Sequence, residues 1–206
     1  METAVVVAAE SEVIAEIDQE PALIQETKIG QLTPFEQLVQ KYDRVVLTVT
    51  QVILGNREEA QEATLESFFT AYKKLSQWQE GERFSMWLMR IVITESLSRL
   101  AAQPGAREYS PDSICSKVGE SLPSKVVDWV ADPKELYDSV ELREILSTSL
   151  RSLPLSSRMV FGLRDIVGSS LRDTAALLGL SLATVRERLL QARLHLRERL
   201  APYFEK

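Results

Sequence analysis

The stretch that most restricts the fold runs from residue 173 to residue 193 and reads DTAALLGLSLATVRERLLQAR. It has the spacing of a helix-turn-helix, with key residues at Ala175, Gly179 and Val185. The small residue lets two helices touch, the glycine takes the positive φ of the turn, and the apolar residue anchors the second helix. Ser181 suits the N-cap of that second helix. The pattern therefore predicts two helices joined by a tight turn.

The second of these helices is rich in arginine, and the arginines follow a pattern. At about 100° per residue, its apolar residues form one stripe that faces the core. One border of the stripe carries Arg186, Arg193 and Arg197, and the other carries Arg188, His195 and Arg199. Two basic rows therefore flank a face that can lie in a groove of DNA.

In a major-groove complex, such a helix can use one set of residues to position itself on the DNA and another to recognise the base sequence. The basic rows reach the phosphate walls, while the residues between them meet the base edges. By chemistry, Gln191 suits adenine, Glu187 suits the cytosine amino group, and Leu190 suits the thymine methyl group. The alternative is a solvated amphipathic helix whose arginine stems only cover apolar surface. The residues predicted to contact DNA are Ser181, Thr184, Arg186, Glu187, Arg188, Leu190, Gln191, Arg193 and Arg197.

This basic helix belongs to a chain that is acidic overall, with a formal net charge of −6. Residues 1–30 hold seven acidic side chains and a single lysine, whereas residues 141–206 hold eleven basic and seven acidic ones. The net negative charge of the whole chain therefore does not extend to the C-terminal module, which is basic by itself. We predict that residues 1–31 form a mobile acidic arm, and a short helix near residues 13–23 is left open.

Helical periodicity also dominates the first half of the chain. From Thr33, apolar residues recur at three- and four-residue steps until Gly55 and Asn56. Two further amphipathic stretches follow, one after Asn56 and one from about Phe84. Three helices of this length predict a small bundle over residues 32–100.

Residues 101–134 interrupt this periodicity with four prolines and two glycines, which predicts a linker. Helical patterns return over residues 135–206. No β-alternation is long enough for a strand. The predicted fold class is therefore all-α, with two small helical modules joined by a flexible linker and a helix-turn-helix in the second module.

Composition and spacing exclude several functional classes. Cys115 is the only cysteine, which rules out an intramolecular disulfide and favours a reducing cytoplasm. The opening METAVVVAAE has too short an apolar run for a signal peptide, and no stretch reaches the roughly eighteen apolar residues of a membrane span. No catalytic or metal-ligand spacing and no glycine-rich phosphate loop is present. We expect no enzyme activity, no cofactor, no metal site and no membrane insertion.

Three motifs give the two modules a family resemblance. They are NREEAQEATLESFFTAYKKL at 56–75, RFSMWLMRIV at 83–92, and LPLSSRMVFGLRDIVGSSLRDTAALLGLSLATVRERLLQAR at 153–193. In their order, separated by a proline-rich linker, they resemble the extracytoplasmic-function subfamily of bacterial RNA polymerase sigma factors. The resemblance covers about residues 33–100 and 136–200.

The resemblance implies a role for each motif. The motif at 56–75 resembles a helix that docks on the largest subunit of core RNA polymerase through Glu59, Glu62, Glu66 and Phe69. The motif at 83–92 resembles the start of a helix that captures an unpaired base of the downstream promoter element and melts promoter DNA. Its implied residues are Trp87, Arg90, Thr94 and Arg99. The motif at 153–193 resembles the module that reads the upstream element. An ordinary core position is the favoured alternative for Trp87.

The chain also departs from the family pattern. Thr94 stands where asparagine is usual, and Ser98 stands where aspartate is common. In the docking motif, Leu65 replaces a usual glutamine, and in the recognition helix Gln191 replaces a frequent arginine. These changes affect promoter melting more than polymerase docking. Fewer phosphate contacts would also weaken DNA affinity and flatten its salt dependence.

Three functional hypotheses follow. The first is a promoter-specificity subunit that binds core RNA polymerase and directs it to promoter DNA, with an anti-sigma factor as a further partner. The second is a regulatory protein of the same fold that binds polymerase or an antagonist but melts promoters poorly. The third, a dimeric helix-turn-helix regulator, lacks an evident dimerisation helix or ligand domain.

Overall fold

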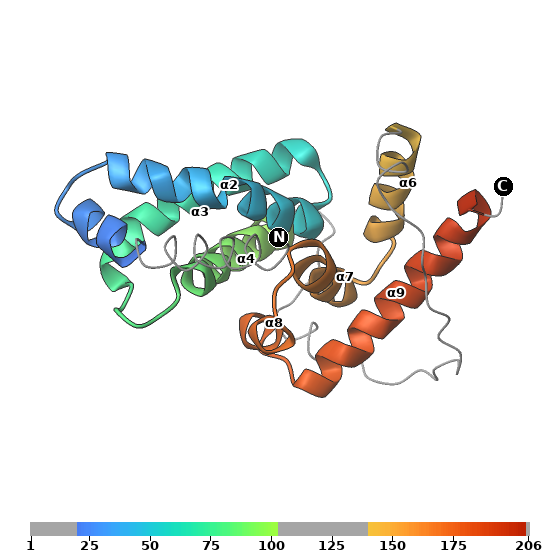
Figure 1. The fold of residues 1–206 in the computed structure, drawn as a ribbon. Coiled ribbons are helices and arrows are strands. Elements are labelled where there is room, and N and C mark those ends of the chain that lie inside the picture. Colours follow the sequence, from blue (N-terminus) through green and yellow to red (C-terminus); the bar gives the residue numbers. More distant parts are fainter. Residues whose placement is uncertain (1–19, 103–139, 205–206) are drawn as a thin grey trace, which may run out of the picture.

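The computed structural model describes residues 20–102 and 140–204 (Figure 1). These residues form helices and no strand, which confirms the all-α prediction. After a helical segment at 20–28, the elements are α2 (Thr33–Leu54), α3 (Arg57–Lys74), η1 (Leu75–Gln77), α4 (Phe84–Ala102), α6 (Val140–Arg151), α7 (Leu155–Phe161), η3 (Gly162–Ile166), α8 (Leu171–Leu178) and α9 (Leu182–Phe204). Cys115 and the linker predicted at 101–134, except its first two residues, lie outside the described residues.

The helices α2, α3 and α4 form the first module, and each packs against the other two (Figure 1). Gly55 ends α2 in the left-handed conformation, at φ 72°. The Asn56 side chain then caps α3 by accepting a 2.9 Å hydrogen bond from the backbone N–H of Glu58. Local sequence therefore places the sharp turn between the first two helices, as the Gly-Asn pair predicted.

The segment at residues 20–28 differs from the predicted mobile arm. Residues 20–28 are helical, and the side chains of Ile24 and Thr27 are buried. The Tyr42 hydroxyl donates a 2.5 Å hydrogen bond to Glu20, and the Lys28 ammonium donates one of 3.1 Å to the Trp78 carbonyl. The prediction of a mobile arm through residue 31 is wrong for this segment, because the helix buries apolar surface on the first module. Residues 1–19 lie outside the described part.

The second module contains the predicted helix-turn-helix. Gly179 takes the left-handed conformation at φ 64° between α8 and α9. The hydroxyl of Ser181 caps α9 by accepting a hydrogen bond from the Thr184 backbone N–H at 3.1 Å. Ala175 and Val185 are buried in one apolar cluster. The three positions singled out by spacing therefore perform the structural roles predicted for them.

The two modules do not stand apart, which the sequence did not indicate. One apolar cluster includes Val49 and Ile53 of α2 together with Met159 of α7 and Leu163 of η3. The helix α2 packs on α7 and η3, and α4 packs on α8. Figure 1 shows α7 and α8 lying between the first module and α9. Within residues 20–102 and 140–204, no helix is long and apolar enough to cross a membrane.

Candidate functional site

An apolar stripe is exposed on α3. Leu65, Phe69 and Tyr72 are 72%, 59% and 38% exposed. They follow one another at four- and three-residue steps, so they lie on one face of the helix. The Tyr72 ring meets Phe35 edge-on at 5.1 Å, and the Lys73 ammonium lies 4.0 Å from the Phe69 ring centre. Three large apolar side chains in one exposed row are typical of a protein-binding surface.

Of these three residues, only Phe69 is assigned to a docking surface by the sequence. Leu65 stands out there only as a departure from the family pattern, and Tyr72 does not stand out at all. The pattern that identifies them is the same three- and four-residue spacing of apolar residues. It lies on the face of α3 opposite the buried Ala60, Ala63 and Ala71. The stripe therefore follows from periodicity once the core face of α3 is known.

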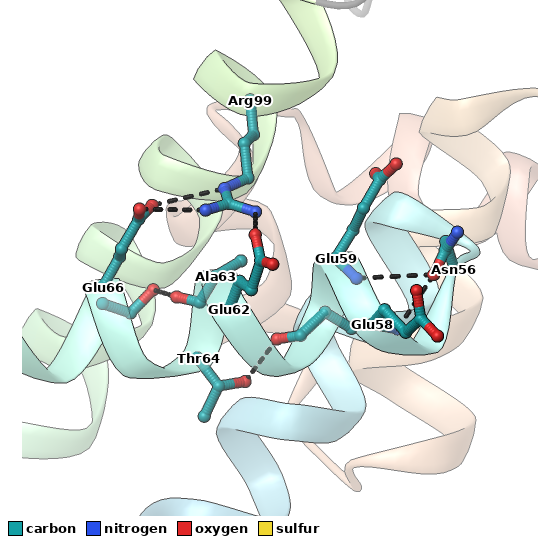
Figure 2. Close-up of polar contacts among 10 residues, drawn as sticks. Asn56, Glu58, Glu59, Glu62, Ala63, Thr64, Glu66 and Arg99 are labelled. Carbon is teal, nitrogen blue, oxygen red and sulfur yellow. Dashed lines mark hydrogen bonds and ion pairs between the residues drawn. The ribbon is translucent and has the colours of Figure 1, made fainter.

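Two predicted docking residues, Glu62 and Glu66, lie on the same helix as the stripe. They share one arginine, Arg99 (Figure 2). The Arg99 guanidinium donates to Glu62 at 2.8 Å, and its fork meets both carboxylate oxygens of Glu66 at 2.9 and 3.2 Å. These hydrogen bonds raise the pKa of Arg99, and the bond to Glu66 has the larger effect. The glutamates remain 68% and 58% exposed at their side chains, whereas that of Arg99 is 25% exposed. The carboxylates can therefore still meet a basic partner. Glu59, the third predicted docking acid, is half-buried nearby.

The structure separates Arg99 from the other residues predicted to melt promoter DNA. Arg90 and Arg99 are nine positions apart, which at about 100° per residue places them on opposite sides of α4. Arg90 and Thr94 are exposed, four residues apart, on one face. Arg99 instead lies against α3. Geometry thus groups Arg99 with the predicted docking surface.

Trp87 occupies the core of the first module. Its side chain is 8% exposed, and its ring lies 5.6 Å from that of Phe84. The alternative of an ordinary core position is therefore the one the structure supports. Arg90 forms an ion pair with Glu82, and the Thr94 hydroxyl donates a 2.7 Å hydrogen bond to the Arg90 carbonyl. The exposed face of α4 thus presents Arg90 and Thr94 without an accompanying aromatic ring from Trp87.

The arginines of α9 divide into exposed and buried ones. Arg186, Arg193 and Arg197, predicted as one basic row, are all exposed. Arg188, from the other row, is 6% exposed, because it lies within the packed module. His195 shares a 2.8 Å hydrogen bond with Ser152 of the turn that follows α6. One row therefore faces solvent as predicted, and Arg188 does not face a phosphate in this arrangement.

A carboxylate already holds one arginine of the exposed row. The Arg193 guanidinium donates two 2.7 Å hydrogen bonds to Asp165 in η3, and this contact raises the pKa of Arg193. A phosphate at this position has to displace Asp165. Arg186 and Arg197 are the more accessible cations of the row.

The face of α9 predicted to read bases is only partly open. Glu187, Leu190 and Gln191 are each of intermediate exposure. Ser181 and Thr184 share a 2.8 Å hydrogen bond between their hydroxyls at the start of α9. The three residues predicted to read bases are therefore partly accessible, and the two hydroxyl residues before them hold the start of α9 in place.

An ion pair joins the second and third motifs across the two modules. Arg83, just before α4, binds both carboxylate oxygens of Asp173 in α8. This bond lowers the pKa of the Asp173 carboxyl and raises that of Arg83. Nothing in the sequence pointed to this pair, because its members lie ninety positions apart.

No metal site accompanies these surfaces in the described part of the chain, where no three His, Cys, Asp or Glu side chains are grouped to hold an ion. The features available for chemistry are an acidic and apolar surface on α3, a polar face on α4 and a basic row on α9. Together they suit binding to protein and nucleic acid.

Comparison with known families places both modules in one family. Residues 38–104 match the family described as Sigma-70 region 2, and residues 143–196 match Sigma-70, region 4. The first match begins within α2 and runs through α4, and the second spans most of α6 to α9.

Curated relatives match over most of their length. The ECF RNA polymerase sigma-E factor of Salmonella typhimurium is 29% identical over 171 residues, which covers 83% of this chain and 88% of the relative. Its Escherichia coli K12 counterpart is 28% identical over the same length. The RNA polymerase sigma-H factor of Pseudomonas aeruginosa is 26% identical, covering 85% of this chain and 91% of the relative.

Solved structures share the fold. CnrH, in complex with the cytosolic domain of CnrY, superposes with a TM-score of 0.63 over 88% of this chain and 96% of that chain, at 22% identity. The sigma factor RpoE of Bartonella quintana, in complex with the anti-sigma factor NepR, gives 0.61 over 81% and 96%, at 21% identity.

Proposed function

This chain belongs to the sigma-70 family, in its extracytoplasmic-function group, and from this premise we propose that it binds core RNA polymerase and directs the enzyme to specific promoters. One observation carries the proposal. The matches to regions 2 and 4 fall, in that order, on two helical modules, and the second module contains a helix-turn-helix with an exposed arginine row.

Polymerase docking is assigned to α3. The stripe of Leu65, Phe69 and Tyr72 supplies apolar area, and Glu62 and Glu66 beside it supply negative charge. Apolar anchors bordered by charge are the usual anatomy of a specific protein interface. The carboxylates steer a basic partner surface toward the stripe, and burial of the stripe then provides affinity. Arg99 holds the two carboxylates in a fixed position.

Promoter recognition is divided between α9 and α4. Arg186 and Arg197 of α9 contact phosphates, while Glu187, Leu190 and Gln191 meet base edges of the upstream element. The exposed Arg90 and Thr94 of α4 contact the unpaired strand of the downstream element. These assignments rest on exposure and chemistry.

The chain acts by binding and not by catalysis of its own, since the transcription chemistry belongs to the polymerase. We place it in the cytoplasm, where polymerase and promoter DNA are found. Because the Bartonella quintana structure is a complex of a sigma factor with an anti-sigma factor, we also propose a protein antagonist of this kind.

Two linked measurements test the proposal. Core RNA polymerase is first captured on the immobilised full chain, and the reconstituted holoenzyme is then tested by run-off transcription on genomic fragments. Capture together with promoter-specific transcripts is the expected result. Capture without transcripts would support the regulatory alternative, and failure of capture would contradict the proposal itself.

A matched pair of variants tests the docking surface in the same experiment. Phe69→Ala should weaken core polymerase binding by about 1–2 kcal/mol, because an exposed aromatic anchor is lost. Tyr203→Ala removes another exposed aromatic ring, in α9, and should leave core binding unchanged. Equal binding by both variants would remove Phe69 from the interface.

A further inference from the structure

A chain of contacts connects the N-terminal helical segment at 20–28 to the face of α4 assigned to the unpaired strand. The segment precedes the region 2 match, which begins at residue 38. Figure 1 shows it at the same end of the first module as the turn between α3 and α4. The buried Ile24 and Thr27 anchor the segment on the module. Its last residue, Lys28, is exposed and reaches the turn.

Lys28 contacts one residue of this turn in two ways. Its ammonium group donates a 3.1 Å hydrogen bond to the Trp78 carbonyl and lies 5.2 Å from the centre of the Trp78 ring. A cation over an aromatic face is attracted by the negative charge of that face. Trp78 is buried and directly follows η1, so Lys28 holds the chain at the point where it leaves α3 and turns toward α4.

Trp78 in turn holds the residue that pairs with Arg90. The Trp78 indole N–H donates a 3.1 Å hydrogen bond to the Glu82 carbonyl, and the Glu82 backbone N–H donates one of 3.2 Å to the Gln79 carbonyl. Gly81 closes this turn at a φ of 94°, which glycine adopts without strain. The Glu82 carboxylate forms the ion pair with Arg90. The turn is therefore a fixed support for a charged side chain of α4.

The ion pair leaves Arg90 able to bind a nucleic acid. A guanidinium group carries five N–H donors, and in the described part of the chain only Nη2 of Arg90 has a partner, which is Glu82. The Arg90 side chain is still 49% exposed. A side chain that is already held in place loses less conformational freedom when a ligand binds. The pair therefore presents the remaining donors of Arg90 to a strand at a lower entropic cost.

We infer that Lys28 is a positioning residue for promoter opening. Through Trp78 and Glu82, it holds the Arg90 guanidinium in place for the unpaired strand of the downstream element. This role rests on the proposed assignment of α4 to that strand. The N-terminal segment thus contributes to promoter opening in addition to the stability of the first module, although it lies outside both matched regions.

Lys28→Met gives the first test, because methionine keeps an apolar stem and removes both the donor and the charge. Run-off transcription by the reconstituted holoenzyme is compared on a duplex promoter and on the same promoter with its downstream element already unpaired. Transcription from the duplex should fall about two- to fivefold, the effect of one hydrogen bond and one exposed cation–π contact. The pre-opened promoter should lose less, because it needs no melting, and capture of core polymerase should not change.

Two further variants control for charge and for stability. Lys28→Arg keeps a cation and hydrogen-bond donors, so it should transcribe both templates as wild type does. Glu26→Gln removes an exposed charge from the same helical segment and should leave the ratio between the two templates unchanged. A variant that only lowers the folded fraction reduces both templates and core capture together. Equal losses on the two templates would therefore overturn the inference.

A double-mutant cycle tests whether Lys28 acts through Arg90. Arg90→Ala alone should lower transcription from the duplex, and adding Lys28→Met should cause no further loss, since the group that Lys28 positions is already absent. An equal loss from Lys28→Met with and without Arg90 would overturn the inference, as would wild-type transcription by Lys28→Met. Undiminished duplex transcription by Arg90→Ala, or failure of the wild-type chain to capture core polymerase, would instead contradict the proposed function, and the role of Lys28 with it.

Discussion

Gly162 and Val52 lie so close together that the first side-chain carbon of any other residue at position 162 would collide with the valine. The backbone of Gly162 is not strained, since its φ is −59°. The glycine is therefore needed for space and not for conformation. Glycine within a helix costs up to about 1 kcal/mol relative to alanine, so this contact offsets a local disadvantage.

Gly162→Ala is expected to destabilise the chain by about 1–3 kcal/mol, because overpacking outweighs the usual gain of a helical alanine. The free energy of unfolding in urea measures this. Val52→Ala in the same chain removes the colliding methyl groups, so the double variant should recover stability relative to Gly162→Ala. No recovery would mean that the two residues do not meet.

The Arg83–Asp173 pair should make the free energy of unfolding depend on pH in the acidic range. Because the native pKa of Asp173 is lowered, its contribution is present above the usual pKa of about 3.9 and is lost as the pH falls through the native value. At pH 7, Asp173→Asn should be less stable than wild type by about 0.2–1 kcal/mol, and the difference should vanish near pH 2. Denaturant unfolding across this range provides the measurement.

Arg83→Gln is the control for that titration, because it removes the pair but leaves the Asp173 charge in the first turn of α8, where it favours the helix. It should cost less stability than Asp173→Asn at pH 7. A pH-independent difference between wild type and Asp173→Asn would show that the ion pair does not form.

Charge reversal tests the acidic side of the docking surface. Glu62→Lys with Glu66→Lys should weaken binding to core polymerase while leaving the helical circular dichroism largely unchanged, since both side chains are exposed. The double reversal also places two lysines beside Arg99. Arg99→Gln, which only removes their partner, separates this effect and should weaken binding less. Undiminished binding by the folded double variant would exclude the surface.

The exposed row of α9 should contribute affinity without specificity. Arg186→Ala should weaken binding to all duplexes alike and reduce the slope of log affinity against log salt by roughly one unit. Gln191→Ala should instead change which upstream element is preferred, at about 1–3 kcal/mol for one base pair. Anisotropy titrations with a set of promoter duplexes distinguish the two patterns.

Asp165→Asn, in η3, is the opposite change, because it frees an arginine of the same row. It releases Arg193 from two hydrogen bonds, so non-specific duplex affinity should rise and the salt slope should steepen. If Arg186→Ala and Asp165→Asn both leave the salt dependence unchanged, α9 does not contact phosphate.

The two parts of the acidic N-terminus should behave differently. Residues 1–19 contain five acidic and no basic side chains. Their deletion should raise non-specific DNA affinity at low salt, with a gain that shrinks as salt is added. Deletion of residues 1–30 also removes the buried Ile24 and should lower stability by at least about 1.5–3 kcal/mol. Thermal melts and DNA titrations of both chains test this, and low-salt DNA affinity no higher than that of wild type would contradict the charge effect.

The elements that the sequence predicted well are those that short-range chemistry determines. Gly179, Ser181 and Gly55 mark turns and caps through hydrogen bonds that span three to five residues, so each is visible in a short window. The exposed row of Arg186, Arg193 and Arg197 follows equally from helical periodicity. Local pattern thus determined the helices, the helix-turn-helix and one basic face.

Sequence alone determined that this chain forms two helical modules with a helix-turn-helix in the second; only the tertiary structure decided what each charged or small residue faces. The sequence predicts Arg188 to contact DNA, but the residue is buried; it assigns Arg99 to the α4 motif, but Arg99 binds α3. Gly162, which no sequence pattern singles out, is a point of contact between the modules. The physical reason is that burial and ion pairing join residues far apart in the chain, such as Arg158 and Ile53, and helical periodicity carries no information about which helices meet.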